Sequence, residues 1–159
     1  MNSSERFRSA LSGVEIKKIK IPIKTILYRG CHRENANAAA IEAIEPRFFT
    51  RNRELAIEYA HKNHNKTERA GSFPFLIKAI TITELILAKI DLVLPLVEAA
   101  YLSNMNQNLC PQEWQRQHLI NAITKELNQK FHGYESINAE EILLQNPSEH
   151  LSIKIQELD

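Results

Sequence analysis

The stretch VEIKKIKIPIKTILYRG, residues 14–30, decides how the chain begins to fold. Apolar residues alternate with lysines through most of it, a pattern that predicts one long strand with a break or two short strands. Pro22 has no amide hydrogen to donate to a sheet, so it belongs at an edge or a bulge. The stretch ends in Tyr28–Gly30, where Arg29 offers a planar fork of donors that matches a phosphate or a carboxylate.

Beyond this stretch, helical and strand patterns alternate without a regular β-α-β rhythm, which predicts the α+β class. Asn52 is expected to cap a helix, Pro95 to open one and Gly133 to end one. The expected helices cover residues 35–44, 53–64, 96–102 and 111–131. The expected strands cover residues 47–50, 73–83, 85–94, 141–144 and 151–155.

Length and charge limit the class of protein. The chain has 159 residues, 43% of them hydrophobic, and a net charge of +1. This length predicts a single domain over residues 1–159, with a polar lead-in at residues 1–13. No apolar run is long enough to span a membrane, so no membrane partner is expected. The near-neutral charge argues against a protein that coats nucleic acid.

Glycine and cysteine usage excludes several kinds of site. The four glycines are Gly13, Gly30, Gly71 and Gly133, too few and too scattered for a dinucleotide-binding or phosphate-binding glycine loop. The two cysteines exclude a cysteine-rich zinc site and indicate a reduced compartment. We therefore expect no metal, and we expect the cytoplasm as the site of action. The polar residues 1–6 are not followed by an apolar signal core, so any secretion into a target cell would use another route.

Three separate segments carry side chains suited to chemistry. The first is Tyr28–Gly30, and the second is Phe48–Thr50 with the helix that follows it. The third, Gly133–Ile137 followed by Glu140 and Glu141, places two carboxylates at the mouth of an apolar strand, where a carboxylate can stabilise a developing cation. Structural readings stay open for all three: a solvated arginine at a turn, core aromatic rings and a solvated strand end.

In this order, the three segments resemble the mono-ADP-ribosyltransferase superfamily of NAD-using toxins and effectors. They look most like the short domains of this type in bacterial and phage polyproteins and toxins. The resemblance covers roughly Ile26 to Ile155. It implies two small, mostly antiparallel sheets packed at an angle around an NAD cleft and flanked by helices. Residues 96–131 would then form a helical insertion beside that core.

The resemblance also implies roles for individual residues. Arg29 would hold the NAD phosphates or the nicotinamide-side ribose, and the backbone of Gly30 would pair with the nicotinamide carboxamide. Thr50 would supply a hydroxyl that steadies the catalytic site, while Phe49 and Tyr59 would wall or stack the nicotinamide ring. Glu141 would be the catalytic glutamate.

The acceptor side of the resemblance is less complete. Either Glu140 or Glu141 could be catalytic, because neighbours on a strand face opposite ways. Glu141 is preferred since Pro147 lies six residues beyond it. Glu140 and Tyr134 are then the candidates for acceptor recognition, with a core or hairpin role as the alternative for Tyr134. Ala139 stands where many arginine-modifying members carry Glu or Gln, so arginine is not favoured as the acceptor.

The implied activity is transfer of ADP-ribose from NAD, the substrate, to a macromolecular acceptor. A protein acceptor is expected, and a nucleic-acid acceptor stays open, as does the oligomeric state. Two further hypotheses stand beside it: an NAD glycohydrolase toxin, in which water is the acceptor, and a catalytically silent protein-binding module.

Overall fold

The computed structural model describes residues 12, 15–44, 47–67, 71–96 and 130–158. These residues belong to the α+β class, as predicted, and form two mostly antiparallel, open sheets. The strands are β1 (Lys18–Ile21), β2 (Ile26–Arg33), β3 (Arg47–Phe49), β4 (Phe73–Thr81), β5 (Leu85–Lys89), β6 (Gly133–Ser136), β7 (Glu141–Leu144) and β8 (Leu151–Glu157). The labelled helices are α2 (Ala36–Ile44), α3 (Arg53–Thr67) and α6 (Pro147–His150), and residues 90–96 are also helical.

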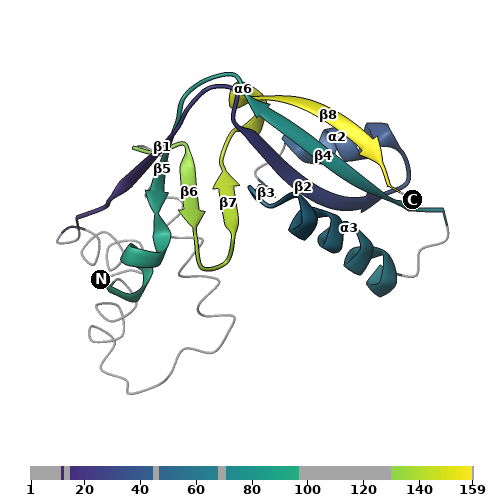
Figure 1. The fold of residues 1–159 in the computed structure, drawn as a ribbon, viewed down its shortest axis with the longest axis horizontal. Helices are drawn as coiled ribbons and strands as arrows, with labels where there is room; N and C mark the ends of the chain where they lie inside the picture. The colour runs from purple at the N-terminus through teal and green to yellow at the C-terminus, as the bar shows by residue number, and fades with distance from the viewer. Residues whose placement is uncertain (1–11, 13–14, 45–46, 68–70, 97–129, 159) are drawn as a thin grey trace, which may run out of the picture.

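The strands divide into a five-stranded sheet in the order β1-β5-β6-β7-β3 and a three-stranded sheet in the order β2-β4-β8. In Figure 1 the two sheets spread apart from the region of α6, with α3 running along β2. Only β5 and β6 pair in parallel among the paired strands of the described residues. None of the helices in the described ranges has the length and apolar character needed to cross a membrane.

Residues 14–30 form two short strands rather than one long strand, and Pro22 lies in the break between β1 and β2. The expected end of the second strand at Gly30 is wrong. Strand β2 continues to Arg33 because its pairing with β4 runs without interruption as far as Phe73. Arg29 and Gly30 therefore lie in the middle of a strand, where paired backbone holds them more firmly than a strand end would.

The expected strand over residues 85–94 is wrong in its second half. Strand β5 ends at Lys89, and residues 90–96 are helical. The buried residues Ile90, Val93 and Leu94 are spaced by three and four, which suits one face of a helix. Pro95 consequently lies inside this helix instead of opening the next one.

Gly133 was expected to end a helix, but it opens strand β6. A Cβ atom at Gly133 would lie 1.8 Å from the carbonyl oxygen of Leu143, so only glycine allows β6 and β7 to approach this closely. The polar lead-in except residue 12, the helix over 96–102 beyond residue 96, and nearly all of the helix over 111–131 lie outside the described residues. The strands expected at 141–144 and 151–155 are confirmed as β7 and β8.

In the described part of the chain, one pair of residues joins the two sheets by backbone hydrogen bonds. Tyr28 of β2 and Thr50, just after β3, exchange two backbone hydrogen bonds of 2.8 Å each. Phe49 in turn pairs with Ile142 of β7. Residues from both sheets share one buried core beneath this junction: Ile21, Leu27, Phe49, Ala79, Leu85, Leu87, Ile142, Leu144 and Leu151. Strand β2 is therefore linked, through β3, to β7, the strand that begins with Glu141.

Helix α3 packs against β2 at Gly30. Asn52 caps the helix as predicted, because its Oδ1 atom accepts a 3.2 Å hydrogen bond from the amide of Leu55. A Cβ atom at Gly30 would lie 1.7 Å from the carbonyl oxygen of Ala56 and 2.8 Å from the amide nitrogen of Ala60. Backbone atoms cannot move aside like the end of a flexible side chain, so glycine at this position sets the distance between helix and sheet.

Replacing Gly30 by alanine should therefore destabilise the fold by about 1–3 kcal/mol, the usual cost of overpacking a well-filled contact. Chemical denaturation of the wild type and of Gly30→Ala measures this loss. Glu58→Ala, an exposed change on the same helix, is the control and should unfold close to the wild type. Equal stability of Gly30→Ala and the wild type would contradict the packing described here.

Candidate active site

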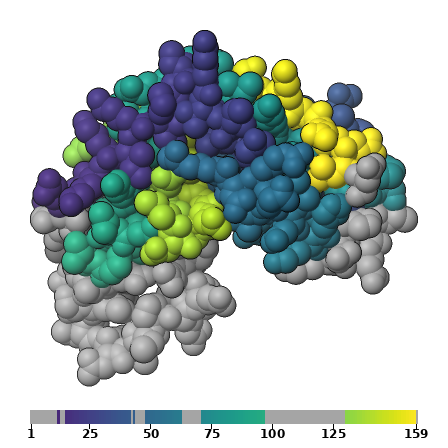
Figure 2. Space-filling model, in the orientation of Figure 1, coloured from purple at the N-terminus to yellow at the C-terminus, as the bar shows by residue number. Residues whose placement is uncertain are grey.

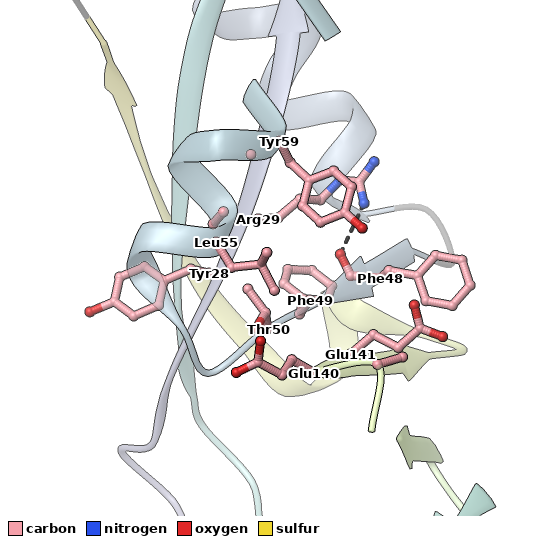
Figure 3. A pocket seen from close by; sticks show the side chains of 12 residues that line it. Tyr28, Arg29, Phe48, Phe49, Thr50, Leu55, Tyr59, Glu140 and Glu141 are labelled. Atoms are coloured by element: carbon pink, nitrogen blue, oxygen red, sulfur yellow. Dashed lines mark hydrogen bonds between the residues drawn. The ribbon is translucent and has the colours of Figure 1, made fainter. Parts of the chain in front are cut away.

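A cavity of about 270 Å³ opens beside the junction of the two sheets. Figure 3 shows its walls, which come from β2, β3, α3 and the start of β7. The lining residues are Tyr28, Arg29, Gly30, Phe48, Phe49, Thr50, Leu55, Ala56, Tyr59, Ala139, Glu140 and Glu141. All three sequence segments thus reach one cavity, and every residue expected to contact NAD lies in its wall.

The cavity exists because the pairing between β2 and β3 stops. Continued beyond Tyr28 and Thr50, an antiparallel ladder would place Gly30 opposite Phe48. Instead the carbonyl oxygen of Phe48 accepts a 2.9 Å hydrogen bond from Nη1 of Arg29. The side chain of Arg29 therefore replaces the backbone hydrogen bond that Gly30 would donate to Phe48 in a continued ladder. This bond also holds the guanidinium of Arg29 against the backbone of β3.

Gly30 contributes backbone rather than a side chain to the cavity. In an antiparallel strand, residues two apart direct their amide groups to the same edge. Tyr28 pairs with Thr50 along the edge of β2 that faces β3. The amide and carbonyl of Gly30 point to this same edge, at the place where the pairing with β3 has ended. A planar ligand with one donor and one acceptor could pair with this piece of backbone.

The two phenylalanines of β3 differ in exposure. Phe49, expected to wall or stack the nicotinamide ring, lines the cavity but is only 2% exposed and also belongs to the shared core. Phe48 is 41% exposed and Tyr59 is 54% exposed, and both line the cavity. Alternation along a strand requires one of two neighbours to point outward, but it does not say which one.

The two glutamates face different parts of the cavity. Figure 3 shows the carboxylate of Glu140 beneath Thr50 and that of Glu141 on the side of Phe48. Glu140 is exposed and has a φ of 52°, and its Oε1 atom accepts a 3.4 Å hydrogen bond from the side chain of Asn52. Glu141 is half-buried as the first residue of β7, opposite Ser136 of β6.

The environment of Glu141 disfavours its charged form. Burial is the larger cause that raises its pKa above the ordinary value of 4.5, and the nearby negative charge of Asp91 raises the pKa further. A carboxylate that is costly to ionise and yet lines a cavity with an arginine is typical of a functional group rather than of a structural ion pair.

Thr50 and Tyr134 are both buried. The hydroxyl of Thr50 accepts a 3.1 Å hydrogen bond from the amide of Asn52, at the start of α3. Tyr134 is 3% exposed in β6 and meets Phe48 edge to face, with ring centroids 6.5 Å apart. Burial and the charge of Glu141 raise the pKa of the Tyr134 phenol. The burial of Tyr134 suits its alternative role in the core, and its role in acceptor recognition stays a prediction.

Two features near the site escaped sequence reasoning. The guanidinium of Arg51 donates two hydrogen bonds, of 2.7 and 3.1 Å, to the carboxylate of Glu135. This ion pair lines a second cavity of about 300 Å³, which shares Thr50 and Glu140 with the first. The other feature is Asp91, whose carboxylate binds the turn before the glutamates. Both partnerships join positions 45 or more residues apart, for which a single sequence holds no signal.

The described residues contain no group of three or more His, Cys, Asp or Glu side chains arranged to hold a metal ion.

Compared with protein-family models, curated proteins and solved structures, the chain matches none of them. The chemistry of the cavity therefore rests on its own residues: a guanidinium, an open backbone edge, two exposed rings and a half-buried carboxylate.

The raised pKa of Glu141 predicts that its charge costs stability. A carboxyl group with a folded pKa above its unfolded value destabilises the fold most at neutral pH, and the cost vanishes below the ordinary pKa of 4.5. Glu141→Gln should therefore melt at a higher temperature than the wild type at pH 7, with the difference shrinking as the pH falls. Thermal melts across this pH range measure it.

The exposed neighbour provides the control, because Glu140→Gln should change the melting temperature little at any pH. A Glu141→Gln variant that melts below the wild type at pH 7 would mean that the charged carboxylate makes a net stabilising contact.

Proposed function

We propose that this protein is a mono-ADP-ribosyltransferase, which cleaves the bond between nicotinamide and ribose in NAD and transfers ADP-ribose to a protein acceptor, as a bacterial toxin or effector domain. The observation that carries the proposal is the shared cavity of Arg29 and Glu141, which also contains the open edge at Gly30 and two exposed rings. Each of these groups supplies one part of the proposed reaction: binding of the phosphates, binding of the nicotinamide or stabilisation of the ribose cation.

The cavity wall suits the nicotinamide end of NAD. A nicotinamide ring is flat, and Phe48 and Tyr59 provide exposed aromatic surface for it. Its carboxamide has one kind of donor and one acceptor, which match the carbonyl and amide of Gly30. The positive charge of Arg29 lies in the same wall, where it would attract the pyrophosphate.

The reaction needs one carboxylate and no general acid. As the bond from ribose C1′ to the ring nitrogen breaks, its electron pair goes to nicotinamide, which leaves as a neutral molecule. The positive charge that remains on the ribose is stabilised by ionised Glu141, which accepts a hydrogen bond from the 2′-hydroxyl. The acceptor then forms a bond to C1′ and gives up its proton.

Hydrolysis of NAD is the second candidate, and it is favoured by the same wall. Tyr134 is buried, and Ala139 carries no functional group at the position before the glutamates where an acceptor contact was sought. Glu140, exposed in the same wall, is the remaining candidate for an acceptor contact. If Glu140 holds no acceptor, the described part of the cavity would accept water at C1′ as readily as a protein side chain.

Nicotinamide release from NAD tests the proposal. The wild type should release nicotinamide, and Glu141→Gln should lower kcat by about 10²–10³-fold, the usual loss on removing one preorganised electrostatic group. Glu140→Gln is the matched control and should stay within about threefold of the wild type, because its carboxylate faces Thr50 instead. The opposite pattern would assign catalysis to Glu140.

Products and binding separate the remaining hypotheses. NAD labelled in its adenylate half should yield labelled protein if the chain is a transferase, and free ADP-ribose alone if it is a hydrolase. A calorimetric titration that finds no NAD binding to the folded protein would overturn both enzymes and favour a protein-binding module.

A further inference from the structure

Asp91 lies outside the cavity, in the helical residues 90–96, and yet its carboxylate binds the turn that leads to the glutamates. Its Oδ1 atom accepts a 2.7 Å hydrogen bond from the hydroxyl of Ser136. Its Oδ2 atom accepts hydrogen bonds of 2.7 Å from the amide of Ile137 and 3.1 Å from the amide of Asn138. One side chain thus satisfies three donors at the start of the turn between β6 and β7.

The rest of the turn is tied to the same point. The hydroxyl of Ser136 accepts a 3.1 Å hydrogen bond from the amide of Ala139, and the carbonyl of Ile137 accepts one of 3.2 Å from the amide of Glu140. These bonds hold Glu140 at a φ of 52°, in the left-handed region that residues other than glycine rarely adopt. Such a conformation persists only where its surroundings fix it.

This turn decides where both carboxylates point. Ser136 and Glu141 are partners in the register of β6 and β7, so the residues between them form a closed loop that must begin and end at that pair. In Figure 2 the green atoms of the segment that includes β6 and β7 lie directly beside the blue atoms of the segment that includes α3. The 3.4 Å hydrogen bond from Asn52 to Glu140 links the turn to the start of α3. A change in the turn would therefore move Glu140 and Glu141 relative to the cavity wall.

We propose that Asp91 is a positioning residue for the two glutamates: its carboxylate fixes the turn at residues 136–140 and so sets the direction in which Glu141 enters the cavity. Its role as a positioning residue for catalysis rests on the proposed function, whereas its role in fixing the turn does not.

The charge of Asp91 adds an electrostatic effect to this geometry. Burial acts to raise the pKa of Asp91, but the hydrogen bonds from Ser136, Asn138 and Ile137 outweigh it and hold the pKa below the ordinary value, so Asp91 stays charged. Among the described residues, the negative charge of Asp91 and the neutral phenol of Tyr134 lie near Glu141, and Glu140 and Arg29 line the same cavity wall. Removing the charge at Asp91 should lower the pKa of Glu141.

Two substitutions separate the hydrogen bonds from the charge. In Asp91→Asn, the amide oxygen can accept from Ile137 and Asn138 while the amide nitrogen donates to the hydroxyl of Ser136, so the turn is kept and the charge is lost. Asp91→Ala removes both. Glu84→Gln, an exposed carboxylate shortly before β5, is the matched control.

For Asp91→Asn, the acid limb of the kcat profile for nicotinamide release should move to lower pH, while kcat at its plateau stays within about threefold of the wild type. For Asp91→Ala, kcat should fall by about 10- to 100-fold, with a smaller change in KM, since displacement of a reacting group by about 1 Å costs this much. The control should match the wild type in both respects. If Asp91 only stabilised the fold, the acid limb of the kcat profile would stay at the same pH in Asp91→Asn as in the wild type.

Two measurements test the role of Asp91 without an activity assay. One is hydrogen exchange at the amides of Ile137 and Asn138, and the other is an NMR titration of the Glu141 carboxyl. Asp91→Ala should exchange these amides at least about tenfold faster, and Asp91→Asn should lower the pKa of Glu141. If Asp91→Ala fails to fold, Asp91→Asn alone carries the test. Unchanged exchange in Asp91→Ala, or an unmoved Glu141 titration in Asp91→Asn, would overturn the proposal. A wild type that releases no nicotinamide would instead overturn the proposed function.

Discussion

The pair of backbone hydrogen bonds between Tyr28 and Thr50 is the connection on which the candidate site depends. It joins the three-stranded sheet to the five-stranded sheet through β2 and the residue that follows β3. Arg29 is the next residue on one side, and Phe49, the partner of Ile142, is the preceding residue on the other. Glu141 precedes Ile142, so this single junction brings a guanidinium and a carboxylate from distant segments to the same cavity wall.

The junction stays short because the carbonyl of Phe48, the next acceptor of the ladder, is occupied by Arg29. Helix α3 covers the face of β2 so closely at Gly30 that no side chain fits between them. The sheets therefore diverge directly beside a fixed positive charge and an open strand edge. The same arrangement that holds the fold together thus creates a cavity with polar backbone in its wall, which an extended sheet would have paired and hidden.

Local patterns were sufficient to predict much of this arrangement. The alternation in residues 14–30, the cap at Asn52 and the strand pattern of residues 151–155 describe elements whose stability is decided by neighbouring residues. The boundary at Lys89 was missed because a mainly apolar stretch of this length suits a buried strand and a buried helix equally well. The strand end at Gly30 was missed because glycine usually marks a turn, whereas here it permits a close contact with a helix.

The details of the site depended on contacts that are distant in the sequence. The choice between Phe48 and Phe49 follows from which face of β3 meets the shared core, and Tyr134 is buried because it lies in β6, between β5 and β7. Asp91 reaches a turn 45 residues away, and Arg51 reaches Glu135 across 84 residues. In one sequence these residues look like ordinary surface charges, because nothing local indicates a partner.

The central claim is that the wall between Arg29 and Glu141 receives the nicotinamide end of NAD. A crystal structure of Glu141→Gln with NAD bound tests it most directly, since this variant keeps the shape of the wall and should not consume the ligand. The account predicts the carboxamide at the backbone of Gly30, the ring beside Phe48 and Tyr59, and ribose C1′ next to residue 141. NAD bound at another surface, with this cavity empty, would contradict it.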